Sequence, residues 1–143
     1  MGVSRVFLDT NFFIYLIQGT GVQAVRARHL LNAFSSRKDH IMTSVMTLGE
    51  LLVQPLRLGD KLLVERYKRL LRGPGISVLP FLEVSAETFA RIRVDKRVKP
   101  PDAIQLAVAS TASCDLFLTN DERLMGLAVP GIQFITSFER APL

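Results

Sequence analysis

Short apolar runs alternate with longer amphipathic stretches along the whole chain. The first run, residues 3–8, is mostly apolar, as expected for a central parallel strand that is covered on both faces. The amphipathic stretches repeat their apolar residues at helical spacing, which predicts helices between the strands. Strands are predicted over residues 3–8, 41–43, 76–79, 114–118 and 129–135, and helices over residues 12–17, 22–35, 59–72, 86–94 and 103–112 and in the segment that follows Ser44. The alternation is typical of βαβ units and a parallel sheet.

Four acidic residues lie where predicted strands pass into helices. Asp9 and Asp121 come just after strand ends, and Glu50 and Asp102 lie in the opening turns of helices. The carboxyl ends of parallel strands meet at one edge of a sheet, so we expect these four side chains to converge. Each also has an ordinary structural role open to it. Asp9 can cap a helix, Asp102 suits a first helical turn after proline, and Glu50 can be a solvated helix residue.

Convergence of these carboxylates implies a metal ion. Like charges a few ångströms apart cannot all stay ionised at neutral pH without a compensating cation. A small set of oxygen ligands that leaves positions for water and phosphate suits Mg²⁺ or Mn²⁺. The pattern therefore predicts a divalent-metal site at this edge of the sheet.

The composition is that of one domain without disulfides. The chain has 143 residues and a single cysteine, Cys114, which lies in an apolar passage and is expected to be a small buried hydrophobe. His29 and His40 lie in polar surroundings without partners at metal-site spacing, so both are expected at the surface. The chain lacks a cleavable signal pattern, and the apolar run at residues 12–17 is too short to span a bilayer. We therefore expect a cytoplasmic protein of one domain, residues 1–143, not associated with a membrane.

Charge and hydropathy suggest partners. Eighteen Lys and Arg against thirteen Asp and Glu give a net charge of +5, and setting the four clustered acids aside leaves eighteen against nine, or +9. A basic surface around an acidic pocket suits a polyanion cut at a metal site, although a basic surface also serves solubility alone. The hydrophobic content of 48% is high for a small domain, so we expect an apolar surface patch to which a second copy or another protein binds.

Four motifs in order resemble the PIN-domain ribonucleases, and more narrowly the toxin component of VapBC toxin–antitoxin systems. The resemblance covers essentially the whole chain, and its order and spacing fit. The matching stretches are Phe7-Leu8-Asp9-Thr10-Asn11, Thr47-Leu48-Gly49-Glu50-Leu51, Pro101-Asp102-Ala103-Ile104-Gln105-Leu106-Ala107 and Phe117-Leu118-Thr119-Asn120-Asp121.

The resemblance implies a three-layer α/β/α domain with a five-stranded, mainly parallel sheet. It also implies an endoribonuclease dependent on Mg²⁺ or Mn²⁺, whose partners are RNA, a VapB-like antitoxin and a second copy in a homodimer. Asn11 and Thr119 would support the site by hydrogen bonds that orient ligands and water. Glu122 is a further acid with no role in the family pattern. The residues implied to hold the metal and carry catalysis are Asp9, Glu50, Asp102 and Asp121.

Three other functions stay open at this stage. An RNA-processing nuclease that is not a toxin could share the same domain. A PIN-like module could bind RNA or protein without catalysis, although the presence of all four acids argues against it. A phosphatase could use Asp9 as a nucleophile, but position 11 is Asn where the haloacid dehalogenase-like family has its acid/base Asp.

Overall fold

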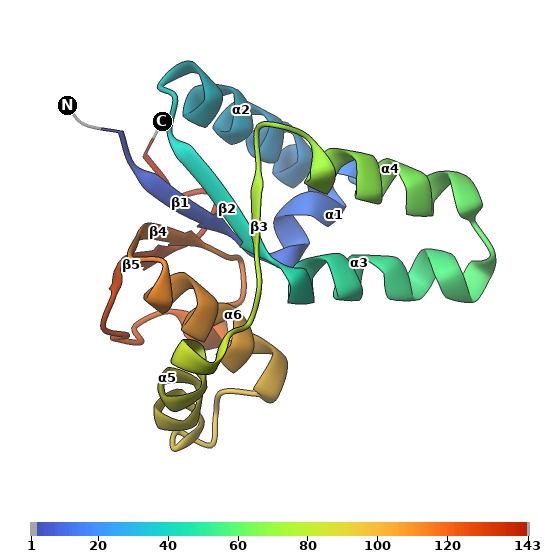
Figure 1. Ribbon diagram of the computed structural model, residues 1–143. Helices are drawn as coiled ribbons and strands as arrows, with labels where there is room; N and C mark the ends of the chain where they lie inside the picture. The colour runs from blue at the N-terminus through green and yellow to red at the C-terminus, as the bar shows by residue number, and fades with distance from the viewer. Residues whose placement is uncertain (1–2, 143) are drawn as a thin grey trace.

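Five parallel strands form the central sheet of the structure, a computed structural model that describes residues 3–142 (Figure 1). Every pair of neighbouring strands is parallel, and the spatial order is β3-β2-β1-β4-β5. The central position of β1 places the end of the first strand, and with it Asp9, in the middle of one sheet edge. The strands are β1 (Arg5–Leu8), β2 (His40–Ser44), β3 (Ser77–Leu79), β4 (Cys114–Leu118) and β5 (Ile132–Thr136).

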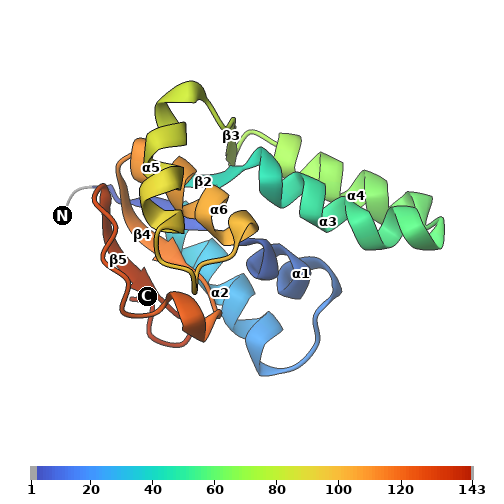
Figure 2. The same cartoon turned by 90° about the horizontal axis from the view of Figure 1, so that it is seen from below.

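Helices cover both faces of the sheet, which confirms the three-layer α/β/α fold. Helices α1 to α4 lie on one side, and α5 and α6 lie on the other (Figures 1 and 2). Their bounds are α1 (Thr10–Gln18), α2 (Val22–Ser36), α3 (Val45–Leu58), α4 (Lys61–Arg72), α5 (Glu83–Arg93) and α6 (Pro100–Thr111), and a 3₁₀ turn, η1, spans Glu122–Leu124.

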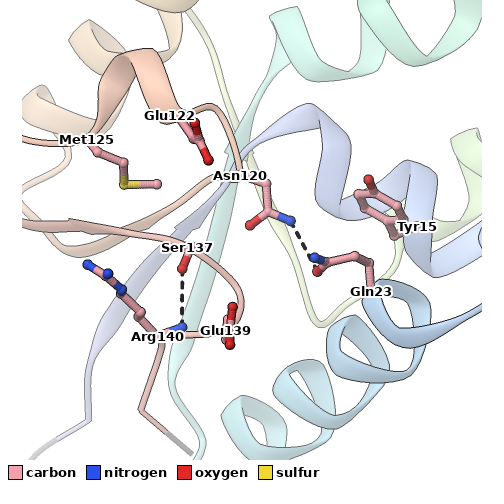
Figure 3. Close-up of a pocket in the computed structure, with 8 residues that line it drawn as sticks. All are labelled: Tyr15, Gln23, Asn120, Glu122, Met125, Ser137, Glu139 and Arg140. Atoms are coloured by element: carbon pink, nitrogen blue, oxygen red, sulfur yellow. Dashed lines mark hydrogen bonds between the residues drawn. The ribbon is translucent and has the colours of Figure 1, made fainter.

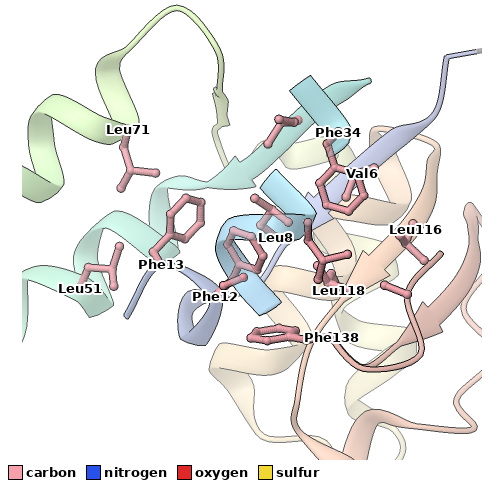
Figure 4. Packing of buried hydrophobic residues seen from close by; sticks show 14 of the residues in the cluster. Val6, Leu8, Phe12, Phe13, Phe34, Leu51, Leu71, Leu116, Leu118 and Phe138 are labelled. Carbon is pink, nitrogen blue, oxygen red and sulfur yellow. The ribbon is translucent and has the colours of Figure 1, made fainter. Parts of the chain in front are cut away.

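Alternation along β1 explains why the sheet needs two helical layers. Val6 and Leu8 belong to the apolar cluster beneath α1 to α4, part of which is drawn in Figure 4. Phe7 points to the other face, where its ring stacks on Phe117 of β4 with centroids 5.1 Å apart. Val6, Phe7 and Leu8 are essentially unexposed and Arg5 is half-buried, so the central strand is mostly apolar, as the sequence predicted.

The segment after β5 closes the first core. Phe138 is completely buried. Its ring makes edge-to-face contacts with the rings of Phe12 and Tyr15, with centroid distances of 5.4 Å and 5.9 Å. Arg26 donates a hydrogen bond from Nε to the Phe138 carbonyl at 2.8 Å, and the Phe138 N–H donates to Asn120 Oδ1 at 3.0 Å. The C-terminal segment thereby fixes the loop that follows β4.

The helix predicted over residues 59–72 begins two residues later than expected. Gly59 adopts a left-handed conformation with φ +67° and ends α3, while the Asp60 side chain caps α4 by accepting from the Leu63 N–H at 3.1 Å. Consecutive residues thus serve two different helix ends, one requiring positive φ and the other a carboxylate.

The starts of β5 and α5 also differ from the prediction, as does that of α6, which begins at Pro100 rather than residue 103. The last strand begins at Ile132 rather than residue 129, because Gly131 turns the chain with φ +89° so close to α6 that a Cβ atom would lie 2.5 Å from the Ser110 carbonyl oxygen. Helix α5 begins at Glu83 rather than residue 86.

Helices α3 and α4 pack side by side as a hairpin that projects beyond the sheet in both views (Figures 1 and 2). The hairpin carries apolar side chains that the chain itself leaves exposed, namely Val53, Leu56, Leu58 and Leu62. Within residues 3–142, none of the helices combines the length and the apolar character needed to cross a membrane.

Phe138 and Phe134 provide a matched test of the C-terminal packing. Phe138→Ala removes a fully buried ring, and we expect it to lower the free energy of unfolding by about 3–5 kcal/mol. Phe134 lies in β5 but is 63% exposed, so Phe134→Ala should cost at most about 1 kcal/mol. Urea unfolding followed by circular dichroism measures both. If Phe138→Ala lost as little unfolding free energy as Phe134→Ala, the C-terminal segment would not belong to the core.

Candidate functional site

Asp9 lies at the centre of the site, directly after β1. One carboxylate oxygen caps α1 by accepting from the Thr10 N–H at 2.8 Å, and the other accepts from the Thr119 hydroxyl at 2.7 Å. Only 8% of Asp9 is exposed. The helix-capping role considered for Asp9 is therefore real, and the same side chain also contacts the end of β4.

Thr119 connects two of the acids. Its hydroxyl donates to Asp9 and accepts from the Asp121 N–H at 3.1 Å, and the residue is completely buried. Asp121 in turn caps the short turn η1 through a bond from the Arg123 N–H at 3.0 Å. One hydroxyl group thus fixes the carboxyl ends of β1 and β4 relative to each other.

Glu50 approaches from α3. Its carboxylate accepts a hydrogen bond from the Thr10 hydroxyl at 2.7 Å, while the residue itself is exposed. Because the Thr10 N–H bonds to Asp9, residue 10 joins Glu50 to the centre of the site. The surface position predicted for an ordinary helix glutamate is correct, but the side chain is turned toward Asp9 and not simply solvated.

Asp102 lies in the first turn of α6, across from Asp121. Arg123 lies between them, with its terminal nitrogen 2.7 Å from Asp121 Oδ2 and 3.6 Å from Asp102 Oδ2. Arg123 also donates from Nε to Asp121 Oδ1 at 3.0 Å. Arg123 is therefore a residue of the site that the sequence did not predict.

Burial and neighbouring charges raise the pKa values of two of the acids, Asp9 and Asp102. Burial raises the pKa of Asp9, and the charges of Glu50 and Asp121 raise it further against the hydrogen bonds from Thr119 and Thr10. Burial also raises the pKa of Asp102, with further contributions from Asp121 and Asp9. The charges of Glu50 and Asp121 thus act on Asp9, and those of Asp9 and Asp121 act on Asp102, while a shared metal site for the four acids stays a prediction.

Asp121 behaves in the opposite way. The hydrogen bond from Arg123 lowers the pKa of the Asp121 carboxyl, and the positive charge of Lys99 acts in the same direction. Arg123 and Lys99 also oppose the upward shift at Asp102. Two cationic side chains thus border the acids on the side of α6 and η1.

A buried layer of hydroxyl and amide groups underlies the acids. Gln105 of α6 donates from Nε2 to the Thr47 hydroxyl at 2.6 Å, and its Oε1 accepts from the Ser44 hydroxyl. Thr43 donates to the Leu8 carbonyl at 2.8 Å and lies 2.8 Å from the Thr47 hydroxyl. Thr47 and Gln105 lie within two of the sequence motifs, which is the one signal that could have singled them out.

The chemistry of these donors fits a hard divalent cation. All four acids present oxygen atoms. The pKa values of Asp9 and Asp102 are raised chiefly by burial and further by neighbouring carboxylates, and a divalent ion would relieve that repulsion. As the side chains lie, no three acidic, histidine or cysteine groups within residues 3–142 enclose a metal position. Glu50 stands apart behind Thr10, and a guanidinium lies between Asp102 and Asp121.

Other residues considered from the sequence lie as follows. Asn11 is exposed, and within residues 3–142 its side chain has no hydrogen-bond partner, so its predicted supporting role stays a prediction. Burial raises the pKa of the Cys114 thiol to about 12, as expected for a buried hydrophobe rather than a nucleophile. His29 and His40 are exposed, as predicted.

A hollow of about 640 Å³ adjoins the acids (Figure 3). Asn120 and Glu122, which flank Asp121 in sequence, line it together with Tyr15 of α1 and residues that follow β5. Asn120 is held there by a bond from its amide to Gln23 Oε1 at 3.2 Å. Glu122, whose role the sequence left open, thus faces this hollow at the start of η1.

Comparisons with known proteins agree with this architecture. The family model of the PIN domain matches residues 6–129. A toxin–antitoxin complex from Klebsiella pneumoniae is similar over 90% of this chain and 95% of that chain, with 25% identity and a TM-score of 0.68. No curated protein sequence matches the chain.

Two further solved structures share the fold at lower identity. DNA-bound VapBC from Salmonella typhimurium covers 95% of this chain and 99% of its own, with 24% identity and a TM-score of 0.67. The Mycobacterium tuberculosis VapC20 toxin, which cleaves the sarcin–ricin loop, covers 82% and 92%, with 19% identity and a TM-score of 0.66.

The raised pKa of Asp9 predicts a pH-dependent gain in stability for Asp9→Asn. The folded protein binds the Asp9 proton more readily than the unfolded chain, so Asp9 favours folding fully below its ordinary pKa of 3.8 and loses that effect as pH rises. In metal-free buffer, Asp9→Asn should raise the free energy of unfolding by about 0.5–2 kcal/mol near neutral pH. The gain should shrink as the pH falls from neutral toward the ordinary pKa of 3.8, as measured by urea unfolding. A variant less stable than the parent throughout would show that the buried charge is well compensated.

Proposed function

Because the chain belongs to the PIN-domain family, we propose that it is a divalent-metal-dependent endoribonuclease and the toxin of a toxin–antitoxin pair. The observation that carries the proposal is the set of contacts at the carboxyl edge of the sheet. Thr10 joins Glu50 to Asp9, Thr119 joins Asp9 to Asp121, and Arg123 lies between Asp121 and Asp102. Such an edge is where open α/β sheets bind ligands.

We assign the four acids to holding Mg²⁺ or Mn²⁺. When bound, the cation supplies Lewis-acid stabilisation of charge on the phosphate and lowers the pKa of water for hydrolysis of the phosphodiester. Thr119 orients Asp9 and the backbone of Asp121, and Thr10 orients Glu50. Asn11 is a second supporting residue in this proposal, since its exposed amide lies two residues from Asp9.

The charges around the acids favour a polyanionic substrate. Lys99 and Arg123 border Asp102 and Asp121, and the rest of the chain carries a basic excess. Cations beside an acidic metal site can bind the phosphates that flank the cut, and this contact is sequence-independent. We therefore propose RNA as the substrate, with its backbone held across the edge of the sheet.

A protein partner accounts for the exposed apolar side chains. Leu56, Leu58 and Leu62 of the α3–α4 hairpin are more than half exposed, which is unusual for side chains of this size without a binding role. The Klebsiella pneumoniae structure with 25% identity is a toxin–antitoxin complex. We propose that an antitoxin and a second copy of the chain cover such surfaces in the cytoplasm.

Metal-dependent RNA cleavage is the direct test. The purified protein should cut a mixed RNA pool with Mg²⁺ or Mn²⁺ and stop when a chelator is added. Asp102→Asn should lower the rate by at least about 100-fold, more than the loss typical of an outer partner of a ligand. Glu87→Gln removes a carboxylate whose side chain is 78% exposed, and it should cleave normally. Cleavage that persists with chelator and in Asp102→Asn would refute the proposal of a metal-dependent nuclease at this site.

Growth of a bacterial host separates a toxin from an RNA-processing enzyme. Expression of the chain should arrest growth, since uncontrolled cleavage depletes RNA, and Asp121→Asn should abolish the arrest. Co-expression of the product of a small neighbouring gene that encodes a DNA-binding protein should restore growth. Efficient RNA cleavage without any effect on growth would favour the processing role.

A further inference from the structure

Arg123 occupies the space between Asp102 and Asp121. Its guanidinium contacts both oxygens of Asp121, at 3.0 Å from Nε and 2.7 Å from the terminal nitrogen, and approaches Asp102 at 3.6 Å. The two carboxylates are about one-fifth exposed, whereas the Arg123 side chain is 51% exposed. A permanently charged group of the chain thus lies where two of the four acids require a cation.

The bond to Asp121 is partly a local property of the backbone. Asp95 and Arg97 have the same spacing and the same geometry, with contacts of 3.0 Å and 2.7 Å. The contact with Asp102 is different, because it joins η1 to α6 across the site. It places the positive charge beside Asp102, whose pKa is raised by burial and by the charges of Asp121 and Asp9.

We propose that Arg123 and the divalent cation compete for Asp102 and Asp121, so that metal binding frees the guanidinium to bind the RNA phosphate. This inference rests on the proposed nuclease function and assigns a residue that couples its metal and its substrate. The same carboxylate oxygens serve both cations, and the charges of the two cations repel each other. Occupation by one therefore disfavours the other.

The position of Arg123 suits such an exchange. Exposed ion pairs are weak, so a divalent ion can displace the guanidinium from the acids. Its backbone is anchored, because the neighbouring Leu124 is buried and the Arg123 N–H donates to Asp121 Oδ1. The planar guanidinium also matches phosphate oxygens in a two-point contact. Released from the acids, it remains beside the position of the substrate.

Metal titration without RNA tests the competition. Mn²⁺ is titrated by calorimetry into the metal-free parent, Arg123→Gln and Arg97→Gln. Arg123→Gln should bind Mn²⁺ about threefold to tenfold more tightly, because the competing charge is gone. Arg97→Gln removes the same charge from an equivalent local pair and should match the parent. Unchanged or weaker binding by Arg123→Gln would overturn the proposal.

RNA kinetics supply the second half of the test. Arg123→Gln should need less metal for half-maximal cleavage, yet at saturating metal it should show a KM for RNA about threefold to tenfold higher, since a phosphate contact is lost. Arg123→Lys should restore part of the parent behaviour. Shifts of both quantities in the unfavourable direction would indicate structural damage and refute the exchange. If neither the parent nor any variant binds Mn²⁺, the proposed nuclease function fails as well. If all three proteins bind Mn²⁺ equally, only the role of Arg123 is refuted.

Discussion

Repulsion among carboxylates at one edge of a parallel sheet is the constraint around which this domain is built. The parallel topology delivers Asp9 and Asp121 to adjacent strand ends, and the following helices bring Asp102 beside Arg123 and Glu50 to Thr10 at the same edge. Left alone, such charges would separate or take up protons. The surrounding structure prevents separation, because Thr119 ties β1 to β4 and Thr10 ties α1 to α3.

The apolar layers supply the rigidity that this arrangement requires. Both faces of β1 are packed, and the buried Phe138 fixes the loop through Asn120, immediately before Asp121. Beneath the acids, Gln105 and Thr47 link α6, α3 and β2 by buried hydrogen bonds. No buried side-chain nitrogen or oxygen in the described part of the chain lacks a partner. A fully satisfied polar layer holds one geometry, since any shift would leave a group without its hydrogen bond.

The sequence predicted the features that depend on local patterns. Apolar runs and the acids at their ends located the five strands and the sheet edge, because a buried strand is apolar and the helices between strands repeat their apolar residues at helical spacing. It did not predict Gly59 and Asp60 as ends of two helices, or the turn before β5, where the approach of Gly131 to Ser110 decides the conformation. It also missed Arg123 and Gln105. Their contacts with Asp102 and Thr47 join different elements, and only the folded arrangement sets those distances.

The two acids beside Arg123 explain why a resident cation is useful to such a site. The pKa of Asp121 is lowered, whereas that of Asp102 is raised, although both belong to one cluster. Burial is the main cause of the rise at Asp102, whereas the two hydrogen bonds from the guanidinium, which only approaches Asp102, dominate at Asp121. A chain without this charge would have to hold its acids apart or protonated before metal arrives. With it, the pKa of Asp121 is lowered and its carboxylate is held by two hydrogen bonds, so under the proposed function a divalent ion would replace one cation by another.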